Sequence, residues 1–235
     1  MNDIYPCYNI YAASLLKHQD LYLEDKGKVS RLAGLFSPND WSHDEVLDRS
    51  LRLLINIWNT NDHLWLLGGS SSLMLQGVGL AKPPNDIDIY ADLRVAKLLH
   101  RLASGRQIDE QVLDRSGTYT SLLSHYRIED SAIELSGGFE ICTEGSFYRT
   151  EVELLSSYAA LYSVQGAAGK VKLTPLSHEL LFNVLRQRED RYIPIATKIT
   201  EDLKEHLPLI RELIARNVWS DQDLSRVEEL LNTRL

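Results

Sequence analysis

The sequence predicts an α+β fold in which helices precede and follow a small α/β core. Apolar residues recur at helical spacing near the start of the chain and again after Thr174. Between these regions, short apolar or alternating runs indicate strands, and glycine pairs interrupt the runs. With 235 residues, the chain can bury a substantial core without disulfides.

Two helices are expected before the core, over residues 8–36 and 44–58. Ser42 and Glu45 fit a capping box at the start of the second helix, in which each side chain bonds a backbone N–H of the first turn. The apolar face of this helix would consist of Val46, Leu47, Leu51, Leu54 and Ile57. We group residues 1–62 as a helical segment packed on the core.

The core begins with the apolar run from Leu64 to Leu67, which predicts a buried strand ending at Gly68 and Gly69. A short helix is expected immediately afterwards. Residues 86–89 alternate between aspartate and isoleucine, as in a strand with one polar face. Residues 92–103 return to helical spacing.

Two further strands are expected over residues 126–135 and 139–143. Gly137 and Gly138 lie between them and are typical of a hairpin turn. We therefore place the core at residues 63–150.

The last part of the chain, residues 151–235, is grouped as a C-terminal helical region. Pro194 and Pro208 are expected to mark helix boundaries, because the residue before a proline avoids the helical conformation. Ser220 and Asp223 are expected to open the last helix.

Charge and composition narrow the function. Of the net charge of −8, the whole deficit lies in residues 1–169, which argues against extended contact with a phosphate backbone. The chain shows neither a signal-peptide pattern nor an apolar run long enough to span a bilayer. Its two cysteines, Cys7 and Cys142, are far apart and fit a reducing compartment. We expect a cytoplasmic protein with no membrane contact.

Asp86 and Asp88 are the first candidate functional residues. Residues i and i+2 of a strand project from the same face, so the two carboxylates share one space. A hard cation such as Mg²⁺ relieves the repulsion between such carboxylates and prefers oxygen ligands. A solvated face of an edge strand is the alternative interpretation of this tripeptide.

The segment from Gly68 to Ser72 is the second candidate. Glycines permit close backbone approach, and the following helix start offers N–H and hydroxyl donors to phosphate oxygens. Gly68, Gly69, Ser70 and Ser71 therefore form a candidate phosphate-binding turn. A plain strand-to-helix turn capped by serine is the alternative.

Together, residues 66–77 and 82–89 resemble the Gly-Gly/Ser and hydrophobic-Asp-hydrophobic-Asp signature of the DNA polymerase β-type nucleotidyltransferase superfamily. Within it, the chain most resembles AbiEii-type toxins and small antibiotic nucleotidyltransferases, where a basic residue often stands four positions before the first aspartate, as Lys82 does here. The resemblance covers residues 64–143. It implies a mixed-sheet core with two Mg²⁺ or Mn²⁺ ions that bind the triphosphate of an NTP.

Such enzymes use a third acidic residue, for which the sequence offers Glu134 and Glu140. If residues 136–138 formed a three-residue turn, the two glutamates would lie side by side. We favour Glu134 as the third metal ligand because its neighbours Ala132 and Ser136 are small, and keep Glu140 as the alternative. Many relatives have aspartate at this position.

The C-terminal region also resembles the family, which has a helix where basic residues precede acidic ones, as in residues 186–190 here. Relatives often carry a lysine there, but this chain has Asn183 and Val184 in that region. Arg186 or Arg188 would then contact the nucleotide phosphates, because the planar guanidinium suits phosphate oxygens. A salt-bridged surface helix is the alternative.

The resemblance implies transfer of a nucleoside monophosphate from an NTP to an acceptor hydroxyl, with pyrophosphate leaving. Asp86 and Asp88 would bridge the metals, and Glu134 or Glu140 would hold the catalytic one. The alternatives are a non-catalytic binding module and a toxin-like protein controlled by an antitoxin-like partner. The acidic charge before residue 170 favours a small or cationic acceptor over tRNA.

Overall fold

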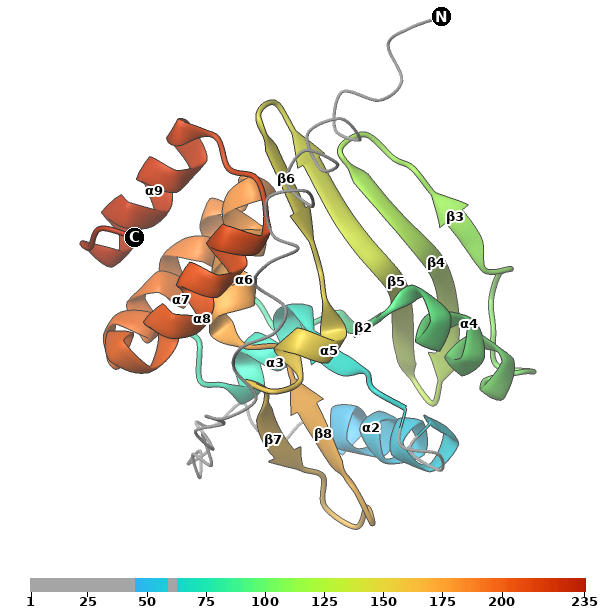
Figure 1. Ribbon diagram of the computed structural model, residues 1–235. Coiled ribbons are helices and arrows are strands. Elements are labelled where there is room, and N and C mark those ends of the chain that lie inside the picture. Colours follow the sequence, from blue (N-terminus) through green and yellow to red (C-terminus); the bar gives the residue numbers. More distant parts are fainter. Residues whose placement is uncertain (1–44, 59–62) are drawn as a thin grey trace, which may run out of the picture.

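The computed structural model describes residues 45–58 and 63–235 (Figure 1). The predicted helix over residues 8–36 and the predicted cap at Ser42 lie outside the described residues. Among the described helices, none is long and apolar enough to cross a membrane.

The described helices are Glu45–Trp58 (α2), Gly69–Leu75 (α3), Leu93–Leu102 (α4), Val152–Leu155 (α5), Leu176–Leu185 (α6), Glu189–Thr200 (α7), Leu203–Arg216 (α8) and Asp221–Leu231 (α9). The described strands are Leu66–Gly68 (β1), Asp86–Ala91 (β2), Val112–Asp114 (β3), Tyr119–Ile128 (β4), Ser131–Thr143 (β5), Ser146–Arg149 (β6), Ala160–Ser163 (β7) and Lys170–Leu173 (β8). The predicted strands at the glycine turn and at the aspartate pair are therefore confirmed as β1 and β2.

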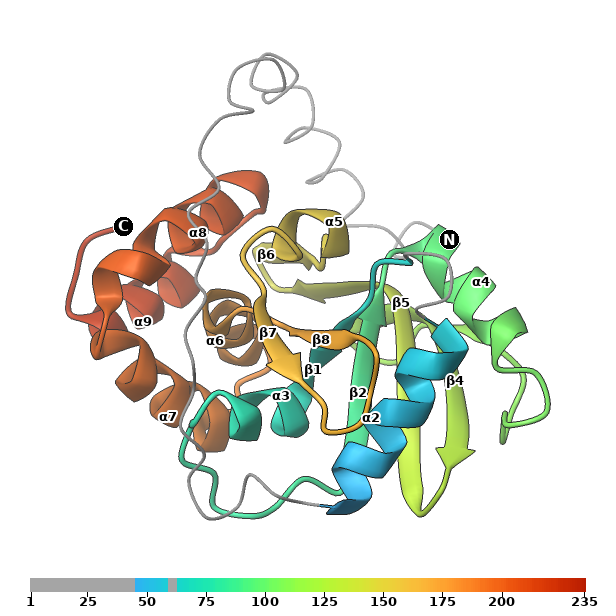
Figure 2. The ribbon, with the colours of Figure 1, turned by 90° about the horizontal axis from the view of Figure 1, so that it is seen from below.

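The strands form one mixed sheet. Its order is β3-β4-β5-β2-β1-β8-β7, and β6 pairs with β5. β2 runs parallel to β5 and β1 parallel to β8, whereas the other neighbours are antiparallel. Helices lie on both sides of the sheet (Figures 1 and 2). The predicted α+β fold, with a mixed sheet flanked by helices, is confirmed.

The alternation of side chains along β2 decides which face of the sheet carries the candidate site. Ile87 and Ile89 are buried in an apolar cluster that joins the sheet to α2 and α4. Asp86 and Asp88 therefore point to the opposite face. Tyr90 continues that opposite row and belongs to a second apolar cluster, formed with α6.

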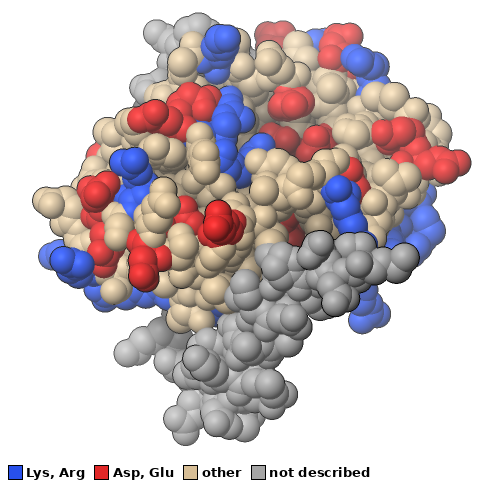
Figure 3. Space-filling model, turned by 90° about the horizontal axis from the view of Figure 1, so that it is seen from above, with Lys and Arg blue, Asp and Glu red and all other residues tan. Residues whose placement is uncertain are grey.

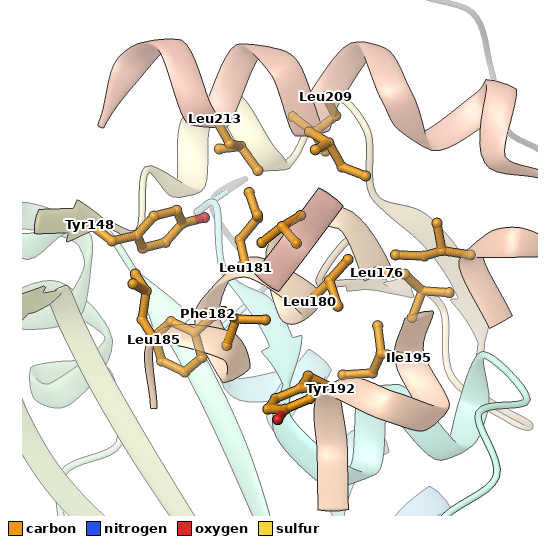
Figure 4. Close-up of a cluster of buried hydrophobic side chains, with 14 of the residues drawn as sticks. Tyr148, Leu176, Leu180, Leu181, Phe182, Leu185, Tyr192, Ile195, Leu209 and Leu213 are labelled. Atoms are coloured by element: carbon orange, nitrogen blue, oxygen red, sulfur yellow. The ribbon is translucent and has the colours of Figure 1, made fainter. Parts of the chain in front are cut away.

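Helix α6 is the centre of this second cluster. Each of its residues is buried. Figure 4 shows its side chains among Tyr148 of β6, Tyr192 of α7, and Leu209 and Leu213 of α8. A helix covered on all sides has no solvated face, so a charged residue on it needs partners inside the protein.

The predicted hairpin at Gly137 and Gly138 is wrong. β5 runs unbroken through both glycines, and the chain reverses instead at Glu129 and Asp130. Gly137 allows α4 to approach, because a Cβ there would lie 2.4 Å from the Cβ of Ala96. Gly138, at φ +58°, lies where the register with β4 shifts, which is the geometry of a β-bulge.

The prediction that prolines mark helix boundaries is also wrong. Pro194 lies inside α7 and Pro208 inside α8. The buried side chains of Tyr192 and Ile195 in α7 flank its proline and pack on α6, which offsets the one backbone hydrogen bond that a proline removes. The predicted opening of the last helix is confirmed, since Ser220 caps α9.

Strands β7 and β8 were not predicted. β8 lies parallel to β1, and the N–H of Thr174 just after it donates to the Leu67 carbonyl at 2.8 Å. This pairing brings the start of α6 next to the glycine turn. The division of the chain at residues 62 and 150 stays a prediction.

Candidate active site

The turn between β1 and α3 packs directly on side chains of β2. In the antiparallel register, Gly68 lies opposite Asp88. A Cβ at Gly68 would lie 2.1 Å from Cε2 of Tyr90, and one at Gly69 would lie 1.8 Å from Oδ2 of Asp88. Gly69 also has φ +56°, a conformation that other residues rarely adopt. Only glycine fits at either position.

A row of carboxylates crosses from β2 to β5. The two strands are parallel and in register, which places Glu134 opposite Asp88. Burial raises the pKa of Asp88 to about 7, and the neighbouring charges of Asp86, Glu134 and Glu179 act in the same direction. The positive charge of Arg186 opposes them. The structure thus brings Asp86, Asp88 and Glu134 together, and their role as metal ligands stays a prediction.

Glu140 lies elsewhere. Its Oε1 is 2.6 Å from Nη2 of Arg149 on β6 and accepts a hydrogen bond from Arg149 Nε. On β5 it lies six residues beyond Glu134, the residue that pairs with Asp88. The expectation that Glu134 and Glu140 lie side by side is wrong, because it rested on the hairpin that β5 does not form.

Glu179 on α6 is a site residue that the sequence analysis missed. It is buried, and its carboxylate accepts hydrogen bonds from the Gly69 N–H at 3.2 Å, Thr174 Oγ1 at 2.6 Å and Asn183 Nδ2 at 3.2 Å. Burial raises its pKa, while these hydrogen bonds and Arg186 oppose the rise. The available signal was a glutamate inside the apolar run from Leu176 to Leu185.

Arg186 ends α6 and reaches the same region. Its guanidinium lies over the rings of Tyr119 and Phe182, at 5.6 and 5.1 Å from their centroids. Its Nε is buried and has no hydrogen-bond partner among the described residues. Arg188, by contrast, makes two hydrogen bonds of 2.9 Å to Asp190 at the surface. The structure therefore brings Arg186, but not Arg188, to the aspartates.

The remaining predicted residues surround the turn. Ser71 Oγ donates to the Asp86 carbonyl at 3.0 Å and so ties α3 to the start of β2. Ser70 is half-buried at the second position of α3, and Lys82 is exposed in the loop before β2. The Gly69 N–H is already bonded to Glu179. Phosphate contact by this turn stays a prediction.

The donor set suits a hard divalent cation. Within residues 45–58 and 63–235, no group of three His, Cys, Asp or Glu side chains is preset around an ion. However, Asp86, Asp88 and Glu134 offer only carboxylate oxygens, and burial, followed by the negative charges of Asp86 and Glu134, raises the pKa of Asp88. Carboxylates that repel each other in this way are what Mg²⁺ or Mn²⁺ would stabilise.

One face of the protein carries both signs of charge (Figure 3). On the face in Figure 3, acidic and basic side chains are interspersed, and the basic ones form no continuous stripe on that face. A duplex or tRNA backbone is bound through arrays of lysine and arginine. This view gives no support to extended nucleic-acid contact.

No protein-family model matches the sequence, and no curated protein matches it. Among solved structures, one from Thermotoga maritima assigned to the nucleotidyltransferases matches with a TM-score of 0.51 at 21% identity, over 71% of this chain and 95% of that one. ANT(2'')-Ia with adenylyl-2''-tobramycin matches with a TM-score of 0.44 at 11% identity, over 71% of this chain and 97% of that one. The lincosamide antibiotic adenylyltransferase LnuA with lincomycin matches with a TM-score of 0.40 at 13% identity, over 63% of this chain and 94% of that one.

The match to the Thermotoga maritima structure shows that this chain has a nucleotidyltransferase fold. The predicted resemblance to that superfamily is confirmed at the level of the fold. The narrower resemblance to AbiEii-type toxins stays a prediction.

Proposed function

We propose that this protein is a metal-dependent nucleotidyltransferase that moves a nucleoside monophosphate from an NTP to an acceptor hydroxyl, with pyrophosphate leaving. One observation carries the proposal. Asp88 lies against the Gly69 turn and between the charges of Asp86 and Glu134, which raise its pKa together with burial. Carboxylates with perturbed pKa values beside a glycine turn are typical of functional sites.

In this proposal Asp86, Asp88 and Glu134 hold the metal, which is Mg²⁺ or Mn²⁺. The bound metal would lower the pKa of the acceptor hydroxyl and neutralise charge on the leaving pyrophosphate. The carboxylates fix its place, because β2 and β5 are neighbours in register. Glu140 is not assigned a role, since Arg149 holds it.

The other residues bind and orient the nucleotide. Gly68 and Gly69 let phosphates approach the backbone without a side chain in the way. Since Glu179 already accepts the Gly69 N–H, the available donors are Ser70 and the buried guanidinium of Arg186. Arg186 is also held by ring contacts with Tyr119 and Phe182, so it would meet a phosphate with little loss of side-chain freedom.

The experiment compares Glu134→Gln with its matched control, Glu140→Gln. Each purified chain is incubated with labelled ATP, GTP, CTP and UTP, with Mg²⁺ or Mn²⁺, and with an acceptor panel of aminoglycosides, tRNA and the protein itself. We expect Glu134→Gln to lower the transfer rate at least about 100-fold while nucleotide binding is kept, because a lost metal ligand acts mainly on the transition state. Glu140→Gln should keep most of the rate.

Two outcomes would contradict the proposal. Nucleotide binding without transfer to any acceptor would favour the non-catalytic binding module. A rate that survives both substitutions would show that neither glutamate holds the metal.

A further inference from the structure

A histidine continues the row of acidic side chains beyond Glu134. β5 pairs with β2 on one side and with β4 on the other. In these registers Glu134 of β5 lies opposite Asp88 of β2 and opposite His125 of β4. Side chains that are opposite across paired strands share a face. His125 therefore lies on the face that carries the candidate metal ligands.

Asp109 fixes the ring of His125. Its Oδ1 accepts the His125 backbone N–H at 2.8 Å, and its Oδ2 lies 2.5 Å from Nδ1 of the same residue. An ionised carboxylate only accepts hydrogen bonds, so Nδ1 carries a hydrogen and the ring cannot turn without losing it. Partial burial opposes ionisation of Asp109, but the hydrogen bonds from His125 leave its pKa below the ordinary value.

The segment that carries Asp109 is itself held along the edge of β4. The Ile108 N–H donates to the His125 carbonyl at 2.8 Å, and the Arg127 N–H donates to the Arg106 carbonyl at 3.1 Å. Backbone hydrogen bonds at His125 itself and at Arg127 thus hold the segment that leads into Asp109. This differs from a flexible surface pair, in which two long side chains meet without such support.

The other ring nitrogen faces Glu134. His125 Nε2 lies 3.8 Å from Glu134 Oε2, while Ser136 Oγ donates to Glu134 Oε1 at 3.2 Å. Each oxygen of the Glu134 carboxylate therefore has a fixed neighbour. With the ring held by Asp109, the carboxylate plane has a limited range of orientations beside Asp88.

We propose that Asp109 and His125 are positioning residues that set the orientation of the Glu134 carboxylate for metal binding. The inference rests on the proposed function. Partners outside the first layer of ligands typically change metal affinity by about 10–100-fold when they are removed. Asp109 and His125 are far enough into solvent, with side chains 44% and 40% exposed, that their loss should leave the fold intact.

The test measures Mn²⁺ binding to the full chain without nucleotide, by the electron paramagnetic resonance signal of free Mn²⁺. We expect Asp109→Ala and His125→Phe to raise the Mn²⁺ dissociation constant at least about 10-fold. Asp109→Asn keeps one of the two oxygens that accept hydrogen bonds from His125 and should restore part of the affinity. Asp114→Ala is the matched control, because Asp114 also accepts a short hydrogen bond, from Ser116, but lies away from Glu134.

Asp88→Asn and Glu134→Gln distinguish a failure of the positioning role from a failure of the proposed metal site. If these variants lose Mn²⁺ binding while Asp109→Ala and His125→Phe keep it, only the positioning role is overturned. If Asp88→Asn also binds Mn²⁺ like the unaltered chain, the proposed metal site itself fails. Circular dichroism and thermal unfolding check that each variant is folded, and His125→Phe carries the comparison if Asp109→Ala is not folded.

Discussion

Gly69 meets two requirements at one position. Its backbone has φ +56°, which alanine adopts only with strain, and the space where a Cβ would stand is taken by the carboxylate of Asp88. The turn can therefore pack against Asp88 of β2 only because Gly69 has no side chain. Any larger residue must displace either the turn or Asp88.

We expect Gly69→Ala to lower the free energy of unfolding by about 1–3 kcal/mol, from the strained backbone and the displaced carboxylate. Gly79→Ala is the control, because Gly79 is exposed, and a Cβ there would meet no described atom within 4 Å. Urea unfolding of the two variants measures the difference. Equal stabilities would show that Asp88 moves aside at no cost.

His178 makes the packing of α6 sensitive to acid. It is buried, its Nδ1 shares a hydrogen bond of 2.7 Å with the Tyr148 hydroxyl, and its Nε2 has no partner among the described residues. Burial lowers its pKa from 6.5 to about 3. The unfolded chain therefore binds a proton that the folded chain rejects, and folding stability falls as the pH drops from 6.5 towards 3.

The contribution of His178 should reach about 1.4 kcal/mol for each pH unit in that range. We expect His178→Phe to have a flatter dependence of unfolding free energy on pH, although it is less stable at pH 7.5 because the Tyr148 hydroxyl loses its partner. Tyr148→Phe breaks the same hydrogen bond but keeps the imidazole, so it should retain the steep dependence. Urea unfolding at several pH values tests this, and parallel curves for both variants would contradict it.

At the scale of elements, the spacing of apolar residues predicted strands and helices correctly where burial of one face sets that spacing. The isoleucines of β2 alternate with aspartates because one face meets α2 and α4 and the other forms the site. In α2, the predicted positions Leu47, Leu51 and Leu54 are buried, whereas Val46 and Ile57 are only partly so.

Predictions from local spacing failed where a residue contacts an element far away in the sequence. Gly137 looked like a turn residue, but its role is to admit Ala96 of α4, which no local pattern reveals. Glu179 was missed for the same reason, since its partner Gly69 lies 110 positions earlier in the chain. Alternation with Ile87 and Ile89 correctly placed Asp86 and Asp88 on a strand. The predicted strand that held Glu134, residues 126–135, instead contains the turn between β4 and β5.

For the whole molecule, the net charge favours a cationic small molecule over a polyanion such as tRNA as the acceptor in the proposed reaction. The deficit of −8 lies before residue 170, and the face in Figure 3 has no continuous basic stripe. Long-range attraction for a polyanion should therefore be weak, while a cationic small molecule would be attracted. The local basic residues, Arg186 among them, suit a triphosphate better than a long backbone.

We expect aminoglycoside-type amines to bind more tightly than tRNA at about 50 mM salt. Contact with many backbone phosphates would lose orders of magnitude in affinity between about 50 and about 200 mM salt, because the counterions it releases must be bound again. Fluorescence titrations with each ligand at both salt concentrations measure this. Submicromolar tRNA binding with a steep salt dependence would refute the preference and favour a toxin-like protein.

The hydrogen bond between Gly69 and Glu179 joins residues 110 positions apart, and Thr174 bonds Ser72 across 102 positions. During synthesis the glycine turn therefore leaves the ribosome long before its partners do. A nascent chain that ends before α6 holds both aspartates but lacks the carboxylate that fixes the Gly69 N–H and the guanidinium that offsets their charge. Closing such long loops is slow and entropically costly. The candidate site is thus among the last parts of the protein to mature.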